Sequence, residues 1–232
     1  AGGIIGTQDA VRSKTDGLTL ILGSYSNMSV NAVCRGERLG YAPSSALRPV
    51  AMLARAPLVI AVRPDSRIQQ FTDLISSFTA HPGIQMYASP GLCSYSDFVA
   101  QYIASRAGVD VVSVAYRGGH DAVQALLGGD VDAVVTELPS AMQAIAAGRL
   151  KPLAISSQEG MSGVPSFADI GFNQFNSQIW YGFFVPAETP SREGRIMQKA
   201  VTEVLKDPEV LRQLQAVGAE PYSLTGAEIF RE

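Results

Sequence analysis

The chain has 232 residues, of which 47% are hydrophobic and 17% charged, and 18 Lys and Arg against 21 Asp and Glu give a net charge of −3. This composition is typical of a packed globular protein and excludes global disorder. The mild acidity gives no broad positive field for nucleic acid or anionic lipid, so we expect no nucleic-acid partner. No apolar run approaches the ~18–20 residues of a membrane span. The length allows one large domain or two small ones.

The two ends of the sequence carry few of the usual signals. It begins Ala1-Gly2-Gly3, without an initiator Met or the basic and apolar regions of a signal peptide, so such a signal is either absent or already removed. Near the other end, Thr225 and Glu228 have the spacing of a capping box, which predicts a helix at the C-terminus. We therefore expect a chain that is cut at both ends.

Short β-rich runs alternate with amphipathic helical runs, which predicts an α/β architecture. Strands are expected at 18–22, 58–62, 84–88, 111–115, 131–135, 151–155 and 179–185. Helices are expected over 71–78, over 122–127 and 141–147, and from Asp207 to Gly218. A helix that ends at Gly108 is expected to turn Phe98, Tyr102, Ile103 and Ala107 inward, and one over 190–205 to turn Ile196, Ala200, Val204 and Leu205 inward. This order of strands and helices implies a largely parallel sheet with right-handed crossovers.

Three connections share one plan, in which a strand is followed by a loop of small residues and then by a helix. They are 89–94, 116–120 and 136–140. In a parallel sheet such loops meet at the carboxyl edge, where open α/β proteins bind ligands. Helix N-termini present unpaired N–H groups that favour anions. Each loop taken alone is more typical of a simple tight turn, but three such loops in succession predict a site for a small carboxylate.

Motifs for phosphate and metal binding are missing from the sequence. It has neither a G-x-x-x-x-G-K-[ST] motif nor a strand-linked G-x-G-x-x-G motif with a downstream acid. His81 and His120 are its only histidines, and no Cys or His cluster has the spacing of metal ligands. We expect no metal site and no cofactor.

The two cysteines, Cys34 and Cys93, allow several interpretations. They could form one disulfide in an oxidising compartment, but two separate, partly buried thiols are the simpler expectation. An enzymatic alternative makes Cys93 the nucleophile of a thiol hydrolase. Its position near a helix N-terminus would lower the thiol pKa, with His120 in the neighbouring loop and Asp97 or Asp121 as an orienting group.

Trp180 is the only tryptophan and lies in the apolar run 178–185. A tryptophan combines a large apolar ring with one N–H donor, so it is typical either of a core anchor or of the wall of a binding cleft. The sequence leaves both interpretations open for Trp180.

A series of short motifs resembles, in order, the substrate-binding receptors of tripartite tricarboxylate transporters, the Bug-type family. Residues 15–20 resemble the D-G-Y-T-L signature of that family, and Val114 to Gly119 resemble its V-P-Y-K/R-G-G segment. Further matching segments are 48–53, 58–66, 89–91, 128–133, 147–154 and 180–190. No single motif is diagnostic, but the ordered set is specific and covers nearly the whole chain.

This resemblance implies an exported, periplasmic receptor with the two-lobed α/β fold of type II periplasmic binding proteins and hinge strands between its lobes. One lobe would hold residues 1–62 plus 157–232, and the other residues 63–156. The implied function is that of a monomer, not an enzyme, that captures a small carboxylate or amino-acid ligand and delivers it to membrane transporter subunits. A sensor for a two-component system, using the same cleft, is the alternative.

The family's binding positions correspond in this sequence to Ser24, Ser89, Gly91, Ser94, Tyr116, Gly118 and Gly119. Cys93 stands where the family usually has glycine, and Glu137 stands where a shorter acid is common. A glutamate facing the ligand would disfavour a second carboxylate and favour an amino group. With Trp180, these residues complete the predicted site. The family also has a strand and a Gly-rich loop before the point where this sequence begins, so we expect one wall of the cleft to be missing.

Overall fold

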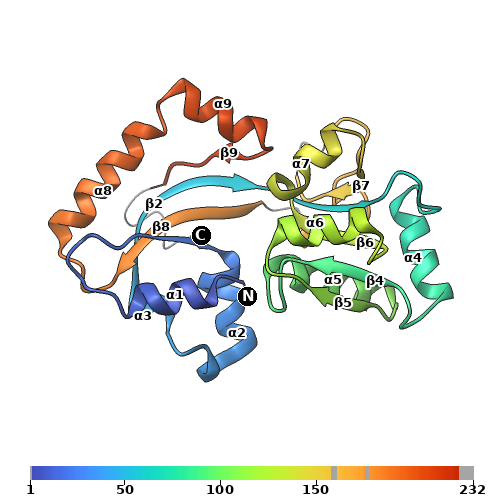
Figure 1. The fold of residues 1–232 in the computed structure, drawn as a ribbon, viewed down its shortest axis with the longest axis horizontal. Coiled ribbons are helices and arrows are strands. Elements are labelled where there is room, and N and C mark those ends of the chain that lie inside the picture. The colour runs from blue at the N-terminus through green and yellow to red at the C-terminus, as the bar shows by residue number, and fades with distance from the viewer. Residues whose placement is uncertain (1, 158–160, 176–177, 225–232) are drawn as a thin grey trace. The chain divides into compact units, whose positions relative to one another are not determined.

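The computed structural model describes residues 2–157, 161–175 and 178–224, which form two compact units (Figure 1). The middle unit is Ala56–Gln178 together with Gly2, and the terminal unit is Gly3–Arg55 together with the described residues from Ile179 onward. The chain passes between them at 55–56 and 178–179, whereas the sequence led us to expect boundaries at 62–63 and 156–157. The strand at 58–62 belongs to the middle unit because both of its neighbours in the sheet lie there.

The middle unit is built on a five-stranded sheet in the order β5-β4-β6-β3-β7. The strands are β3 (Leu58–Val62), β4 (Met86–Ser89), β5 (Val112–Ala115), β6 (Ala133–Glu137) and β7 (Lys151–Ile155). β4 pairs in parallel with both β5 and β6, as the alternation of strands and helices predicts. β3 runs antiparallel to β6 and β7. The sheet is therefore largely parallel, with one reversed strand that the sequence pattern did not indicate.

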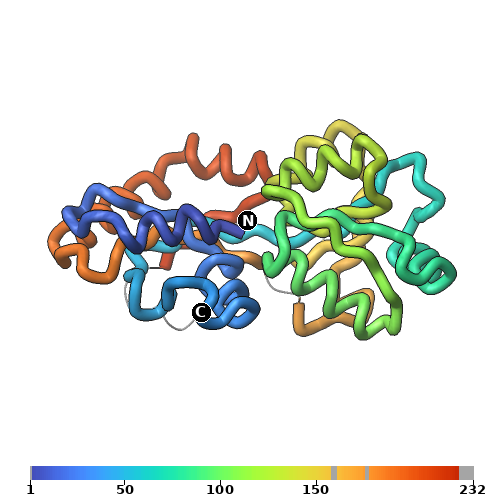
Figure 2. Tube along the Cα trace, turned by 60° about the horizontal axis from the view of Figure 1, so that its bottom comes forward, coloured from blue at the N-terminus to red at the C-terminus, as the bar shows by residue number. Residues whose placement is uncertain are grey.

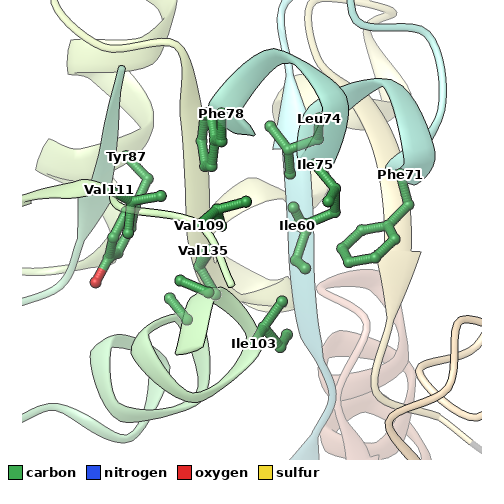
Figure 3. A pocket seen from close by; sticks show the side chains of 13 residues that line it. Ile60, Phe71, Leu74, Ile75, Phe78, Tyr87, Ile103, Val109, Val111 and Val135 are labelled. Atoms are coloured by element: carbon green, nitrogen blue, oxygen red, sulfur yellow. The ribbon is translucent and has the colours of Figure 1, made fainter. Parts of the chain in front are cut away.

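Helices cover both faces of this sheet. They are α4 (Phe71–Ala80), α5 (Tyr95–Ala107), α6 (Gly119–Gly128) and α7 (Leu138–Ala146), with a short 3₁₀ turn η3 (Asn173–Phe175) nearby in the chain. Side chains alternate along a strand. Val134 accordingly packs in the core that α6 and α7 share with the sheet, and its neighbour Val135 lines a small apolar cavity under α4 and α5 (Figure 3). The middle unit thus has three layers.

Local signals in the sequence explain where these helices begin and end. Gln70 and Asp73 form a capping box at the start of α4, and Gly108 ends α5 in the left-handed conformation. The expected inner face of α5 is confirmed at Ile103, which is buried, and wrong at Phe98. Phe98 is exposed, and both Phe98 and Tyr102 stack edge-on against Phe175. Val99, Ala100 and Ala104 form the buried face of α5 together with Ile103.

The terminal unit combines the beginning and the end of the described chain, so blue and orange-red segments lie together in Figure 2. Its sheet has the order β1-β8-β2-β9. The strands are β1 (Ile21–Ser24), β2 (Leu47–Ala56), β8 (Ile179–Pro186) and β9 (Glu220–Pro221). The helices are α1 (Ile4–Val11), the π-helical turn η1 (Ser26–Val30), α2 (Asn31–Arg35), the 3₁₀ turn η2 (Gly36–Leu39), α3 (Pro43–Ala46), α8 (Ser191–Val204) and α9 (Pro208–Ala216).

Two apolar clusters hold the terminal unit together. Trp180 and Phe184 of β8 pack on one face of the sheet, with Met28 of η1 among the side chains against them. On the other face, Met197 and Val201 of α8 pack against the core. No residue of α8 is fully buried, and Ile196 and Val204 are exposed, so the inward face expected for this helix is wrong. The reason is that the helix meets the sheet along an adjacent stripe of residues.

Two further expectations concern the ends of the chain and membranes. The strand expected at 18–22 starts later, since β1 spans Ile21–Ser24. The helix expected to begin after Thr225 lies outside the described residues. Among the residues that the structure describes, no helix is both long and apolar enough to cross a bilayer.

Candidate functional site

The three predicted junctions lie at one edge of the sheet in the middle unit. β4, β5 and β6 run in the same direction, so the loops that follow them leave from their shared carboxyl edge. The backbone N–H of Tyr116 donates to the carbonyl oxygen of Ser89 over 3.0 Å, which joins the first two loops. Ser96 in the first turn of α5 donates to Oε1 of Glu137 over 3.3 Å, which joins the first and the third. The structure therefore brings together eight of the ten predicted residues on neighbouring loops.

The turn from Ser89 to Ser94 is held in an unusual backbone conformation. Gly91 has φ 150°, and Cys93 has φ 61°, in the left-handed region that favours glycine. This agrees with the resemblance, in which glycine usually occupies the position of Cys93. Ser94 caps α5, and its hydroxyl accepts the N–H of Asp97 over 3.2 Å. The Ser94 side chain is buried and committed to this cap in the structure.

Asp97 is the buried centre of the polar network that supports this turn. Its Oδ2 accepts the N–H of Cys93 over 3.2 Å, and its Oδ1 accepts the hydroxyl of Tyr87 over 2.8 Å. Gln101 donates in turn to the Tyr87 oxygen over 2.9 Å. Burial, together with the neighbouring Asp97 charge, raises the pKa of the Tyr87 phenol, so Tyr87 stays protonated and remains a donor. Asp97 therefore acts here as a structural support for the loop.

Sequence reasoning missed this structural role of Asp97. Ser94 and Asp97 stand three residues apart, in the S-x-x-D pattern that precedes many helices. That spacing alone would have identified Ser94 as a cap and Asp97 as its partner in the first turn.

The start of α6 differs from the start of α5 because no side chain caps it. Gly118 is the N-cap residue, with an extended backbone, and a Cβ built on it would meet nothing within 4 Å. A Cβ built on Gly119 would instead lie 2.5 Å from Oγ1 of Thr136 and 2.7 Å from Cβ of Ser140. Gly119 is thus required for close packing of α6 on the third loop, whereas Gly118 leaves open space before the first N–H groups of α6.

Glu137 ends β6 and stands at the N-cap of α7. Its Oε2 accepts the hydroxyl of Thr136 over 3.1 Å and its Oε1 that of Ser96. Burial raises the pKa of this carboxyl, and the bonds from its own N–H, Thr136 and Ser96 oppose the rise. Glu137 therefore holds a proton more readily than an exposed glutamate does.

The Tyr116 side chain lines a surface groove beside α6. Arg117, Asp121 and Asp130 line the same groove. Burial, followed by the Asp130 charge, raises the pKa of the Tyr116 phenol. Asp121 and Asp130 beside the ring disfavour an anion in this groove. The Tyr116 N–H already donates to the carbonyl oxygen of Ser89, so neither part of Tyr116 offers a free donor to an anion here.

Both cysteines are disulfide-bonded, and neither is a free thiol. The expectation of two separate thiols is therefore wrong. The hydrolase alternative is wrong as well, because Cys93 has no thiolate to act as a nucleophile while its sulfur is in a disulfide. His120 lies in the first turn of α6 and is exposed. Within the described ranges, no three His, Cys, Asp or Glu side chains are grouped so that they could hold a metal ion.

The two remaining predicted residues, Ser24 and Trp180, lie in the terminal unit. The Ser24 N–H and hydroxyl both donate to Oδ1 of Asn27, over 2.8 and 3.2 Å. Trp180 is buried, with its ring centroid 5.3 Å from that of Tyr25. Its indole N–H has no acceptor among the residues that the structure describes. Trp180 is thus part of the core of the terminal unit.

Comparison with known proteins places the chain in a family. The model of the tripartite tricarboxylate transporter family receptor matches residues 1–231. Protein BugT of Bordetella pertussis is 29% identical over 228 residues, which are 97% of this chain and 70% of BugT.

Solved structures agree with this match. One described as a periplasmic transporter has a TM-score of 0.94 and 34% identity, and the match covers 100% of this chain and 78% of that one. MatC from Rhodopseudomonas palustris, solved with bound malate, has a TM-score of 0.88 and 27% identity over 95% of this chain and 76% of MatC. The chain therefore has the two-lobed α/β fold of type II periplasmic binding proteins, and it belongs to the tripartite tricarboxylate transporter receptor family.

Proposed function

We propose that this protein is a periplasmic receptor that binds a small carboxylate-containing metabolite and delivers it, as a monomer and without catalysis, to the membrane subunits of a tripartite tricarboxylate-type transporter. Membership of the receptor family supports this function. The similar protein MatC holds malate, a small dicarboxylate. The ligand is held at the sheet edge of the middle unit, where the three loops meet.

The observation that carries the proposal is the uncapped start of α6. Its first N–H groups have no side-chain acceptor, and the space beside Gly118 is open. These groups also lie at the positive end of the helix dipole. At α5, by contrast, the hydroxyl of the N-cap residue Ser94 already accepts the N–H of Asp97 in the first turn. A ligand carboxylate at Gly118 and Gly119 would satisfy donors that nothing in the described protein satisfies.

The energies involved are sufficient for a useful affinity. Hydrogen bonds to a charged group contribute about 1.5–3 kcal/mol each, and micromolar binding requires about −8 kcal/mol in total. A few N–H contacts at the start of α6 reach that range. No bulk positive charge is needed, which agrees with the net charge of −3.

The protonation state of Glu137 determines whether a second carboxylate or an amino group of the ligand is favoured. When ionised, it repels a second carboxylate and attracts an amino group, as in an amino acid. When protonated, it donates a hydrogen bond to a carboxylate oxygen. Its raised pKa makes the protonated form accessible at a higher pH than it is for an exposed glutamate. We propose that dicarboxylates bind more tightly as the pH falls and that amino acids bind more tightly as it rises.

A thermal-shift screen of the purified protein tests this function. The panel contains malate, other di- and tricarboxylates, aromatic acids and amino acids, each at millimolar concentration. At 100 times its Kd, a ligand stabilises the folded state by about 2.7 kcal/mol, which is several degrees in Tm. Stabilisation by at least one carboxylate class supports the proposal, and no stabilisation by any member of the panel contradicts it.

A further inference from the structure

A narrow groove runs between α6 and α7, on one face of the sheet in the middle unit. Both helices start at the carboxyl edge of the sheet (Figure 1), and a Cβ built on Gly119 of α6 would meet the Ser140 side chain of α7. Further along, the two helices leave an opening of about 160 Å³ between them. We call this opening the α6–α7 groove, and the residues that line it include Val123, Leu127, Ala144, Ala147 and Arg149.

The α6–α7 groove carries one fixed charge, and that charge is positive. Arg149 follows the end of α7 and is exposed, and the described residues that line the groove include no Asp or Glu. In the part of the chain that the structure describes, the Arg149 guanidinium makes neither an ion pair nor a hydrogen bond. Arg63, by contrast, donates to the carbonyl oxygen of Leu126 over 3.2 Å and pairs with Asp65 over 3.3 Å. Arg149 is thus a cation without a partner beside an apolar opening.

Two amide side chains stand on opposite sides of the groove. Gln124 belongs to α6 and Gln143 to α7, and both are exposed. Neither side chain makes a hydrogen bond to another residue that the structure describes. Each amide has donors and an acceptor for a polar group. Because the two amides come from different helices, a ligand between them is confined on two sides, which favours a flat body over a bulky one.

We propose that the α6–α7 groove is a second binding site, for a small monocarboxylic acid with a flat apolar body about the size of a benzene ring. In other proteins an apolar cavity of about 150 Å³ binds benzene, and the groove has a similar size. The guanidinium of Arg149 can donate two parallel hydrogen bonds to one carboxylate. A single fixed positive charge beside apolar side chains favours a monoanion over a dicarboxylate or a phosphate.

This second site is separate from the site proposed at the start of α6. The helix α7 spans Leu138–Ala146, so its two ends lie about 12 Å apart. Gly118 stands at the end of the helix pair where both helices begin, and Arg149 follows the other end of α7. A carboxylate held by Arg149 therefore leaves the uncapped N–H groups of α6 free. The second site does not depend on the proposed receptor function.

The test is an NMR titration of benzoate into the parent protein and into Gly118→Leu, in which the start of α6 is blocked. We expect saturable shifts of the amide signals of groove residues, such as Leu127 and Ala144, in both proteins. Arg149→Gln should weaken this binding at least about tenfold, because the charged partner of the carboxylate is lost. Arg106→Gln removes an exposed arginine from the last turn of α5 and should leave the binding unchanged.

A second pair of variants tests whether benzoate occupies the groove itself. Ala147→Leu fills part of the groove and should abolish the shifts of the groove residues. Ala146→Leu adds the same side chain at the neighbouring position, which is also exposed but does not line the groove, and should preserve these shifts. Because both alanines are exposed, both variants should remain folded.

Two further probes separate the charge of the ligand from its apolar body. Inorganic phosphate and benzyl alcohol should each bind the groove at least about tenfold more weakly than benzoate. The proposal is overturned if benzoate gives no saturable shift in the groove, or if its affinity is equal within either pair of variants. Phosphate that binds as tightly as benzoate would also overturn it, since Arg149 would then hold an adventitious ion only. If benzoate binds in the groove while no carboxylate binds at the start of α6, the second site stands and the proposed receptor function fails.

Discussion

The hydroxyl of Ser113 donates to Oδ1 of Asp97 over 2.6 Å, which ties β5 to the first turn of α5. Tyr87 of β4 donates to the same oxygen, and the Cys93 N–H donates to the other. One carboxylate thus connects two parallel strands with the loop at their carboxyl edge. We conclude that the conformation of this edge depends on Asp97.

Replacing Asp97 by alanine should destabilise the protein strongly. The change leaves the Ser113 hydroxyl and the Cys93 N–H without this acceptor in a buried environment. We expect the free energy of unfolding to fall by about 2–5 kcal/mol, measured by urea denaturation. Asp121→Ala, at an exposed position in the first turn of α6, should cost less than about 1 kcal/mol. Equal losses for the two variants would show that the network contributes little.

Glu137 should make stability depend on pH. Burial raises its pKa above the ordinary 4.5, so the folded protein binds this proton more tightly than the unfolded chain does. The free energy of unfolding therefore falls as the pH rises through 4.5 toward the folded pKa. Glu137→Gln removes this loss, so the stability of the variant relative to the parent should increase with pH.

Urea denaturation at several pH values between about 4 and 7 measures this difference. Ser96→Ala removes a donor that lowers the Glu137 pKa. The free energy of unfolding of this variant should therefore fall more with rising pH than that of the parent. The free energy of unfolding of Glu137→Gln minus that of the parent should increase with pH. If this difference stays constant or decreases, Glu137 does not have a raised pKa in the folded protein.

The apolar cavity of the middle unit offers a test of packing. It measures about 30 Å³ and lies between α4, α5 and the sheet (Figure 3). Val135→Ile adds one methylene to its lining and should stabilise the fold by about 0.8 kcal/mol. Val134→Ile makes the same change on the opposite, filled side of β6, where overpacking should cost about 1–3 kcal/mol. If both variants change the free energy of unfolding in the same direction, the cavity does not accommodate the added methylene.

The two glycines at the start of α6 should respond differently to a methyl group. Gly119→Ala places a Cβ against Thr136 and Ser140 and should cost about 1–3 kcal/mol of stability. Gly118→Ala adds the same group in open space and should leave the unfolding free energy within about 0.5 kcal/mol of the parent. Ser140→Gly removes part of the clash and should restore some stability to Gly119→Ala. If Ser140→Gly does not raise the stability of Gly119→Ala, the loss in Gly119→Ala does not come from contact with Ser140.

The sequence predicted the middle unit well because its signals are local. Alternating strands and helices, Gly108 at the end of α5 and the glycines at 118 and 119 each act within a few residues. These signals were enough to place three loops at one sheet edge. Because β4, β5 and β6 pair in parallel, most of the candidate site follows from the order of elements alone.

Features that depend on distant partners were not predictable in this way. The reversed direction of β3 is set by its pairing with β6 and β7, which lie far away in the sequence. Ile196 and Val204 have the spacing of an inward stripe, but the side of a helix that meets a sheet depends on how the sheet lies beneath it. The bonded state of the cysteines likewise depends on the three-dimensional approach of their sulfurs.

The most direct test of the proposed receptor is calorimetric titration of carboxylates into the parent and two matched variants at opposite ends of α6. Gly118→Leu fills the open space at the start of the helix, and Gly128→Leu places the same side chain at its end. We predict roughly micromolar binding of at least one small carboxylate by the parent and by Gly128→Leu, and at least about a hundredfold weaker binding by Gly118→Leu. Equal affinity in all three proteins, or no carboxylate bound by the parent, would contradict the account.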